Sequence, residues 1–137
     1  MEQKKITYHE GFKYQLTEDY TIQTNIKGYD FENRFIKLNI YGSLTFKAGW
    51  SWNGVSGFKD IKSMMRASCV HDGIYWLINY CIIPDTYKNY GDKLFKEICI
   101  EDKLDKHLAD IAYNIVDKLG VHAAKPGRQR PILEAPC

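Results

Sequence analysis

Apolar and polar residues alternate in the first part of the chain as they do in β-strands. Within residues 35–40, Ile36, Leu38 and Ile40 occupy every second position, which would give a strand one buried and one wet face. Gly42 follows, and because glycine tolerates positive φ, a tight hairpin is expected at Tyr41-Gly42. Short β-branched and aromatic runs separated by turn residues predict four strands, over residues 12–16, 20–24, 35–40 and 43–47.

The second half has a different period. Apolar residues recur there at three- and four-residue steps, the spacing of a helix that buries one face. Asp85 or Thr86 is expected to cap the second helix, after Pro84 breaks the chain, and Gly120 is expected to end the third. The pattern predicts three helices, over residues 61–80, 86–100 and 104–119.

These elements predict an α+β fold in which a small N-terminal antiparallel β-sheet precedes a Gly-rich loop and a three-helix C-terminal part. The chain has 137 residues, of which 45% are hydrophobic and 26% charged, and this suits a single domain with one core. We expect residues 1–58 to be β-rich, 59–120 helical and 121–137 an extended tail.

Composition excludes several classes of function. The net charge of +2 is too small to indicate a nucleic-acid partner, and the basic residues near the C-terminus are interpreted as a solvated tail. Residues 73–84, the longest uncharged stretch, are too few for a transmembrane segment, and no signal peptide is recognisable. We therefore expect a cytoplasmic protein or one packaged in an assembly. Its four cysteines lack zinc-site spacing and are expected to be reduced.

The candidate chemistry centres on His71-Asp72, inside the first predicted helix. Neighbouring helical residues point about 100° apart, so the two side chains would serve different tasks. His71 could act as a general base, and Asp72 could give oxygen ligands to a cation. The turn at Pro84 makes the first two helices antiparallel, and Asp92 is then the best candidate to orient His71. Tyr75 lies one turn from His71, on the same side.

The Gly-rich loop would supply the third part of the site. Gly54 and Gly57 permit conformations that turn backbone carbonyls toward one point, and Asn53 offers a neutral side-chain oxygen. A turn-stabilising role is at least as good an explanation of Asn53. Trp50, Trp52 and Trp76 would form either part of the core, which we favour, or a rim that faces a lipid or a partner.

In these motifs the chain resembles phospholipase A2, particularly its short bacterial and fungal forms. The resemblance covers about residues 50–95 and rests on Trp50-Ser51-x-Asn53-Gly54-x-Ser56, Ser68-Cys69-x-His71-Asp72-x-x-Tyr75 and Asp92-x-x-Phe95. Over nearly its whole length the chain also resembles an uncharacterised family of phage and prophage proteins. That second resemblance rests on Gly11-Phe12-Lys13-Tyr14, Trp52-Asn53-Gly54-x-Ser56-Gly57, His71-Asp72-x-x-Tyr75 and Ala135-Pro136.

The phospholipase resemblance implies that His71 activates a water for attack on a phospholipid ester, with Asp92 orienting His71 and Tyr75 buttressing the pair. It implies that Ca²⁺, if used at all, is held by Asp72 with Asn53 and Gly54. The ligand would lie against four loop residues, Trp52, Asn53, Gly54 and Ser56. The short bacterial enzymes have an acidic residue where this chain has Asn53, and losing that charge should weaken calcium binding.

The phage-family resemblance leaves the function open. It suggests a protein of the host cytoplasm or the phage virion, either a hydrolase or an inactive descendant of one. The alternative is a non-catalytic protein that binds a virion component or a host factor, or an anti-defence protein that sequesters a small phosphorylated ligand. In these alternatives His71, Asp72 and Asp92 form a buried polar network that fixes helix packing.

Overall fold

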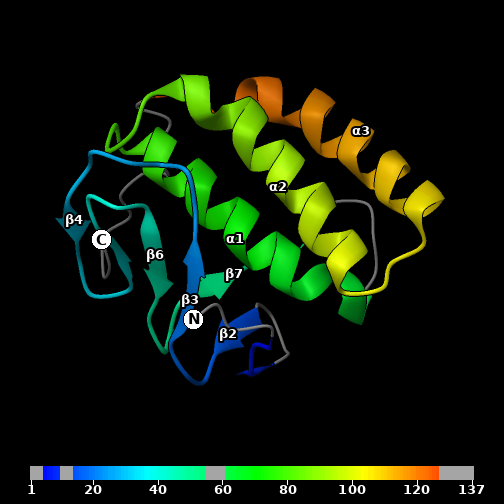
Figure 1. Ribbon diagram of the computed structural model, residues 1–137, viewed down its shortest axis with the longest axis horizontal. Coiled ribbons are helices and arrows are strands. Elements are labelled where there is room, and N and C mark those ends of the chain that lie inside the picture. Colours follow the sequence, from blue (N-terminus) through cyan, green and yellow to red (C-terminus); the bar gives the residue numbers. More distant parts are fainter. Residues whose placement is uncertain (1–4, 10–13, 55–60, 127–137) are drawn as a thin grey trace, which may run out of the picture.

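The computed structural model describes residues 5–9, 14–54 and 61–126. Among these residues, seven short strands form two antiparallel sheets, which lie beneath the helices in Figure 1. One sheet has the strand order β1-β2-β7 and the other β3-β6-β5-β4. The strands are β1 (Tyr8–His9), β2 (Tyr14–Leu16), β3 (Tyr20–Gln23), β4 (Phe31–Glu32), β5 (Ile36–Leu38), β6 (Ser43–Phe46) and β7 (Ser51–Trp52).

The four-stranded sheet buries one face because its strands alternate. Ile36 and Leu38 on β5 are fully buried, whereas Lys37 between them is exposed. In the antiparallel register Ile36 lies opposite Phe46 of β6, and Leu38 opposite Leu44, so the buried side chains form one continuous apolar surface.

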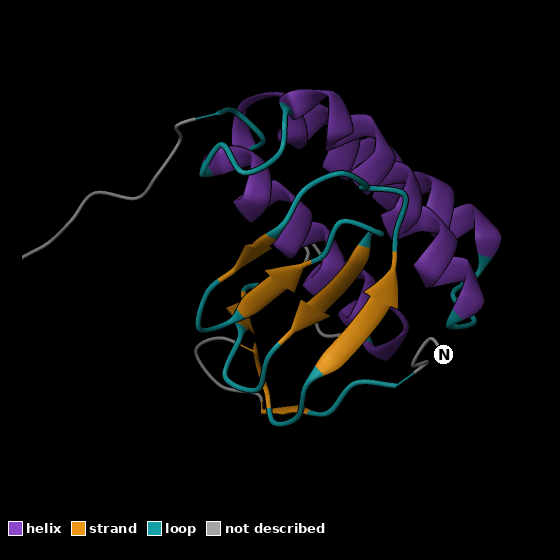
Figure 2. Ribbon diagram, turned by 60° about the vertical axis from the view of Figure 1, so that its left-hand side comes forward, coloured by secondary structure: helices purple, strands orange, loops and turns teal. Residues whose placement is uncertain are grey.

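The helices cover that surface, as Figure 2 shows from the side. The helical elements are α1 (Lys62–Asn79), the single 3₁₀ turn η1 (Asp85–Tyr87), α2 (Lys88–Glu101) and α3 (Lys106–Ala123). Helix α1 is buried on nearly all sides, and α2 packs between α1 and α3. No helix that the structure describes is long and apolar enough to cross a membrane.

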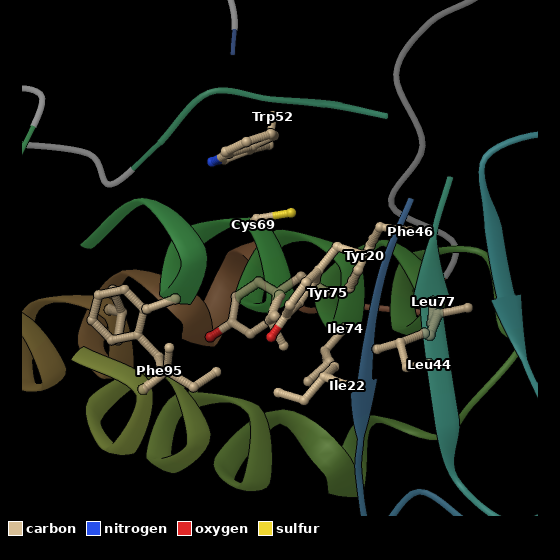
Figure 3. Close-up of a cluster of buried hydrophobic side chains, with 14 of the residues drawn as sticks. Tyr20, Ile22, Leu44, Phe46, Trp52, Cys69, Ile74, Tyr75, Leu77 and Phe95 are labelled. Carbon is tan, nitrogen blue, oxygen red and sulfur yellow. The ribbon is translucent and has the colours of Figure 1, made fainter. Parts of the chain in front are cut away.

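The core lies where α1 meets the four-stranded sheet. Figure 3 shows Leu44 and Phe46 from the sheet lying close to Leu77 and Ile74 of α1. Gly73 permits this close approach, since a Cβ atom there would lie 2.0 Å from the Phe46 ring. Helix α1 is thereby fixed against the sheet, which holds its His71-bearing turn in place.

The α+β class is therefore confirmed, and the four predicted strands correspond to β2, β3, β5 and β6, of which the last three are shorter than predicted. Residues 12 and 13 of the first strand lie outside the described residues. The hairpin at Tyr41-Gly42 is also present, and Gly42 has a φ of +88°. The prediction of one sheet was incomplete, because it missed three two-residue strands, β1, β4 and β7, that are too short to show alternation.

Two predicted helix ends were wrong. Helix α2 begins after the 3₁₀ turn with Tyr87 at its N-cap, so neither Asp85 nor Thr86 caps it. Helix α3 continues through Gly120 to Ala123, and its N-cap is Asp105, whose carboxylate accepts hydrogen bonds from the backbone of His107 and Leu108.

Some apolar residues of the helical part are exposed. Cys81 is exposed in the turn after α1 and has a φ of +60°. On α3 the large residues Leu108, Ile111 and Leu119 are exposed, while the smaller Ala109, Ala112 and Val116 face the core. Small residues occupy that face where α3 packs closely against α2.

Candidate functional site

Helices α1 and α2 bring His71 and Asp92 together. The two helices run antiparallel: Arg66, near the start of α1, pairs with Asp102 just after α2, and His71, one turn further along, reaches Asp92 in the middle of α2. Gly91 fits this crossing, because a Cβ there would lie 3.1 Å from Ile74. The expected pairing of His71 with Asp92 therefore follows from the way the helices pack.

Asp92 is completely buried and receives three hydrogen bonds. His71 Nε2 and the Tyr75 hydroxyl donate to Oδ1 at 2.7 and 2.6 Å, and Lys88 Nζ donates to Oδ2 at 2.7 Å. Because a carboxylate only accepts, Nε2 must bear the proton, and this leaves Nδ1 as the basic nitrogen of neutral His71. Tyr75 thus supports the His–Asp pair as the resemblance implied.

Helix α3 completes the network. Sequence reasoning missed this contribution of α3. Lys88 Nζ also donates to the side chain and the backbone carbonyl of Asp117, both at 2.9 Å. Gly120 of the same helix lies against Tyr75, since a Cβ there would be 2.0 Å from the phenolic oxygen. The spacing of Lys88 and Asp92, four apart on one helix, was the signal that could have revealed Lys88.

The electrostatics of the network favour the charged forms of both His71 and Asp92. Burial opposes the charged form of His71, but the carboxylates of Asp72 and Asp92 outweigh it and raise the pKa of His71. Asp72 Oδ1 lies 3.9 Å from Nδ1, which is too far for a hydrogen bond, so Asp72 acts through its charge. Burial also opposes ionisation of Asp92, but hydrogen bonds from His71, Lys88 and Tyr75 lower the pKa of Asp92.

A cavity of about 150 Å³ lies beside His71. Asp72 and Tyr75 line it together with Gly54 from the loop, and α3 supplies an apolar wall that includes Val116 and Leu119. Since Nε2 is bonded to Asp92, the edge of the ring that carries Nδ1, next to Asp72, is the one available to a molecule in this cavity.

The loop residues occupy different positions around the site. Trp52 is buried, and its indole nitrogen donates to Ser68 Oγ at 2.9 Å, which ties β7 to α1. Gly54 has a φ of +80°, and a Cβ there would lie 2.8 Å from the Tyr14 ring, so glycine is required twice over. Asn53 is exposed. Ser56, and Gly57 with it, lies outside the described residues.

The expected calcium ligands are only loosely grouped. Asp72 is about one-third exposed; it borders the His71 cavity with Gly54, and a second hollow with Asn53. Within residues 5–9, 14–54 and 61–126, no group of three or more His, Cys, Asp or Glu side chains could hold a metal ion. The described donors are thus one carboxylate, one amide and backbone carbonyls, which suits at most a weak site for a hard cation.

Comparisons with known proteins found no relative of this chain. No family model matches the chain, and neither a curated protein nor a solved structure matches it. The functional argument therefore rests on the geometry of this site.

Proposed function

We propose that this protein is a phospholipase A2-like hydrolase of lipid esters, or a descendant that retains the site without its activity. The observation that supports the proposal most directly is the orientation of His71. Its Nε2 is fixed by buried Asp92, and its Nδ1 edge borders a cavity with an apolar wall. A carboxylate-oriented imidazole beside an apolar cavity suits water activation next to an acyl chain.

In the proposed reaction a water molecule in the cavity gives its proton to His71 Nδ1 while its oxygen forms a bond to the ester carbonyl carbon. Asp92 stabilises the imidazolium through Nε2–H, as Tyr75 and Lys88 hold the carboxylate in position. The tetrahedral intermediate then collapses, the ester C–O bond breaks, and Nδ1–H returns the proton to the leaving alcohol.

Calcium is an optional part of this proposal. Asp72 would hold it with the side chain of Asn53 and the carbonyl of Gly54, and bound Ca²⁺ would supply positive charge near the ester oxygen. One carboxylate and two neutral oxygens predict low affinity, in keeping with the loss of an acidic residue at position 53.

The second candidate is a non-catalytic phage protein that binds a virion component or a host factor. The degree of burial of His71 favours it, because only 7% of this residue is exposed. In that case the network of His71, Asp92 and Lys88 would serve to hold the three helices together, as buried and fully paired polar groups often do.

The decisive experiment measures fatty-acid release from short-chain phospholipids and from p-nitrophenyl octanoate, with Ca²⁺ and with a chelator. We expect hydrolysis by the unmodified protein and a loss of roughly 10²- to 10⁴-fold on His71→Ala. His107→Ala is the matched control, since His107 is an exposed histidine of α3 outside the site. Circular dichroism would verify that both variants fold.

Two outcomes would contradict the hydrolase proposal. One is absence of hydrolysis of any of these esters under either calcium condition. The other is activity that persists in His71→Ala, which would assign the hydrolysis to a contaminant or to another site. Either result would leave the binding protein as the better explanation.

A further inference from the structure

A second hollow, of about 650 Å³, adjoins the His71 cavity. Asp72, Tyr75 and Ala123 line both spaces, so the two meet at the candidate catalytic residues. This volume lies within the range of small-molecule binding sites, about 300–1,000 Å³. We call it the aromatic hollow; its wall includes Phe35, Trp50, Trp52, Trp76, Asn79 and Tyr80.

Two aromatic side chains of the hollow stack on each other. The rings of Trp76 and Tyr80 are stacked, with centroids 4.3 Å apart and an angle of 24° between planes. Tyr80 is 41% exposed although it belongs to a paired set of large rings. An exposed aromatic ring of this kind packs well against the apolar face of another ring, for example the C–H face of a sugar.

Two residues in the wall of the hollow each carry a buried polar atom that has no hydrogen-bond partner among the described residues. Among the described residues, neither Trp50 Nε1 nor Asn79 Oδ1 makes a hydrogen bond. One is a donor and the other an acceptor, and leaving either unpaired away from water is unfavourable. A hydroxyl group both accepts and donates, so a ligand rich in hydroxyls could satisfy both atoms.

The charge of the hollow argues against an anionic ligand. Of the lining residues in the described part of the chain, Asp72 is the only one that is charged, and the others are aromatic, small or neutral amide and hydroxyl side chains. A phosphate would face the Asp72 carboxylate without a compensating cation, which is unfavourable. A neutral ligand avoids this repulsion.

We propose that the aromatic hollow binds a neutral sugar ring, which stacks on the exposed ring of Tyr80, backed by Trp76, and bonds to Trp50 Nε1 and Asn79 Oδ1 through its hydroxyls. If the proposed hydrolase function holds, on which this second step rests, the sugar is the head group of the substrate. The substrate is then a neutral acyl sugar or glycolipid whose ester lies at Asp72 and Tyr75, with its acyl chain in the His71 cavity.

Binding can be tested without catalysis. All three tryptophans of the chain line the hollow, so intrinsic fluorescence reports on its occupancy. Octyl β-glucoside and octyl phosphate, both below their micelle concentrations, share one chain and differ in the head. We expect the glucoside to bind about ten-fold more tightly or better, the equivalent of one good polar or stacking contact.

Variants of the wall sharpen the binding test. Tyr80→Ala and Asn79→Leu should each weaken octyl glucoside binding by about ten-fold. Tyr41→Ala is the matched control, because Tyr41 is a 71% exposed tyrosine that does not line the hollow, and it should bind as the unmodified protein does. Equal or tighter binding of octyl phosphate, or unchanged affinity in both wall variants, would overturn the proposal.

A second arm separates this inference from the hydrolase proposal. It compares kcat/KM for octanoyl glucose, dioctanoyl phosphatidylglycerol and p-nitrophenyl octanoate, and we expect the sugar ester to be the best substrate. Cleavage that favours the phospholipid would overturn the sugar head group but leave the hydrolase proposal intact. If no ester is cleaved while glucoside binding depends on Tyr80, the hydrolase proposal fails and the sugar site stands.

Discussion

At the residue scale, the site depends on which donors bond to each oxygen of one carboxylate, that of Asp92. Asp92 Oδ1 accepts from His71 and Tyr75, and Oδ2 accepts from Lys88. With no exposed surface, this carboxylate receives its stabilisation from these donors in place of water. The histidine is therefore fixed in one tautomer with Nδ1 as its basic nitrogen, the feature that both proposals for this site share.

Replacing Asp92 by Asn tests this arrangement directly. The variant removes the charge that favours imidazolium, so the pKa of His71 should fall, and any hydrolysis should fall by roughly 10²-fold or more. Unfolding by urea should show a loss of about 3 kcal/mol, because His71 and Lys88 lose a buried partner. Asp110→Asn, at an exposed ion pair with Lys96, is the control and should change stability by about 0.5 kcal/mol or less.

The raised pKa of His71 predicts a specific pH dependence. Because the folded protein binds this proton more tightly than the unfolded chain, the stabilisation from charged His71 is complete below about pH 6.5 and is lost as the pH rises through the folded-state pKa. Urea unfolding from about pH 5 to about pH 8 should show the unmodified protein losing its advantage over His71→Gln. A difference between the two that does not vary with pH would contradict the raised pKa.

At the element scale, the site formed by α1 and α2 is completed by a third helix, α3. It supplies Asp117 to Lys88, an apolar wall to the cavity and a close contact with Tyr75 at Gly120. These interactions require α3 to pack closely, and its buried face accordingly consists of small residues such as Ala109 and Ala112.

Gly120→Ala should disturb this contact. The added Cβ would lie 2.0 Å from the Tyr75 oxygen and 2.9 Å from Lys88 Cε, so α3 or both side chains must shift. Although alanine favours helices, we expect a net loss of about 1–3 kcal/mol from overpacking. Asn114→Ala, on the exposed face of the same helix, should be neutral or slightly stabilising in thermal unfolding. A stabilised Gly120→Ala variant would contradict the packing described.

The same glycine shows where sequence reasoning reaches its limit. Periodicity located the three α-helices of the described residues and the His71–Asp92 pair, because both depend on spacing along the chain and on antiparallel packing. It could not distinguish a glycine that ends a helix from one that permits a close approach, which is the role of Gly120. Asp117 was missed for a similar reason, since its contact with Lys88 depends on how α2 and α3 are placed in space.

At the scale of the whole molecule, Arg66 joins the sheet to the helices. It lies on α1, is 2% exposed, and donates to the Tyr20 hydroxyl of β3 at 2.9 Å. Its Nε and one terminal nitrogen also form a two-pronged pair with Asp102 at 3.0 and 2.9 Å, and it contacts Glu101. Burial opposes the charged form of Arg66, but the interactions with Asp102, Tyr20 and Glu101 together outweigh it and raise the pKa of Arg66, so Arg66 stays charged.

Arg66→Met should therefore weaken the whole fold while leaving the chemistry of His71 in place. The variant keeps much of the apolar stem but removes the hydrogen bonds to Asp102 and to the Tyr20 hydroxyl, and a loss of about 3 kcal/mol in urea unfolding is expected. Arg66→Lys keeps the charge without the two-pronged geometry and should lose less. Lys62→Met, at an exposed position one turn earlier on α1, should change stability by about 0.5 kcal/mol or less. Equal stability of Arg66→Met and Lys62→Met would show that the link between sheet and helices does not depend on this arginine.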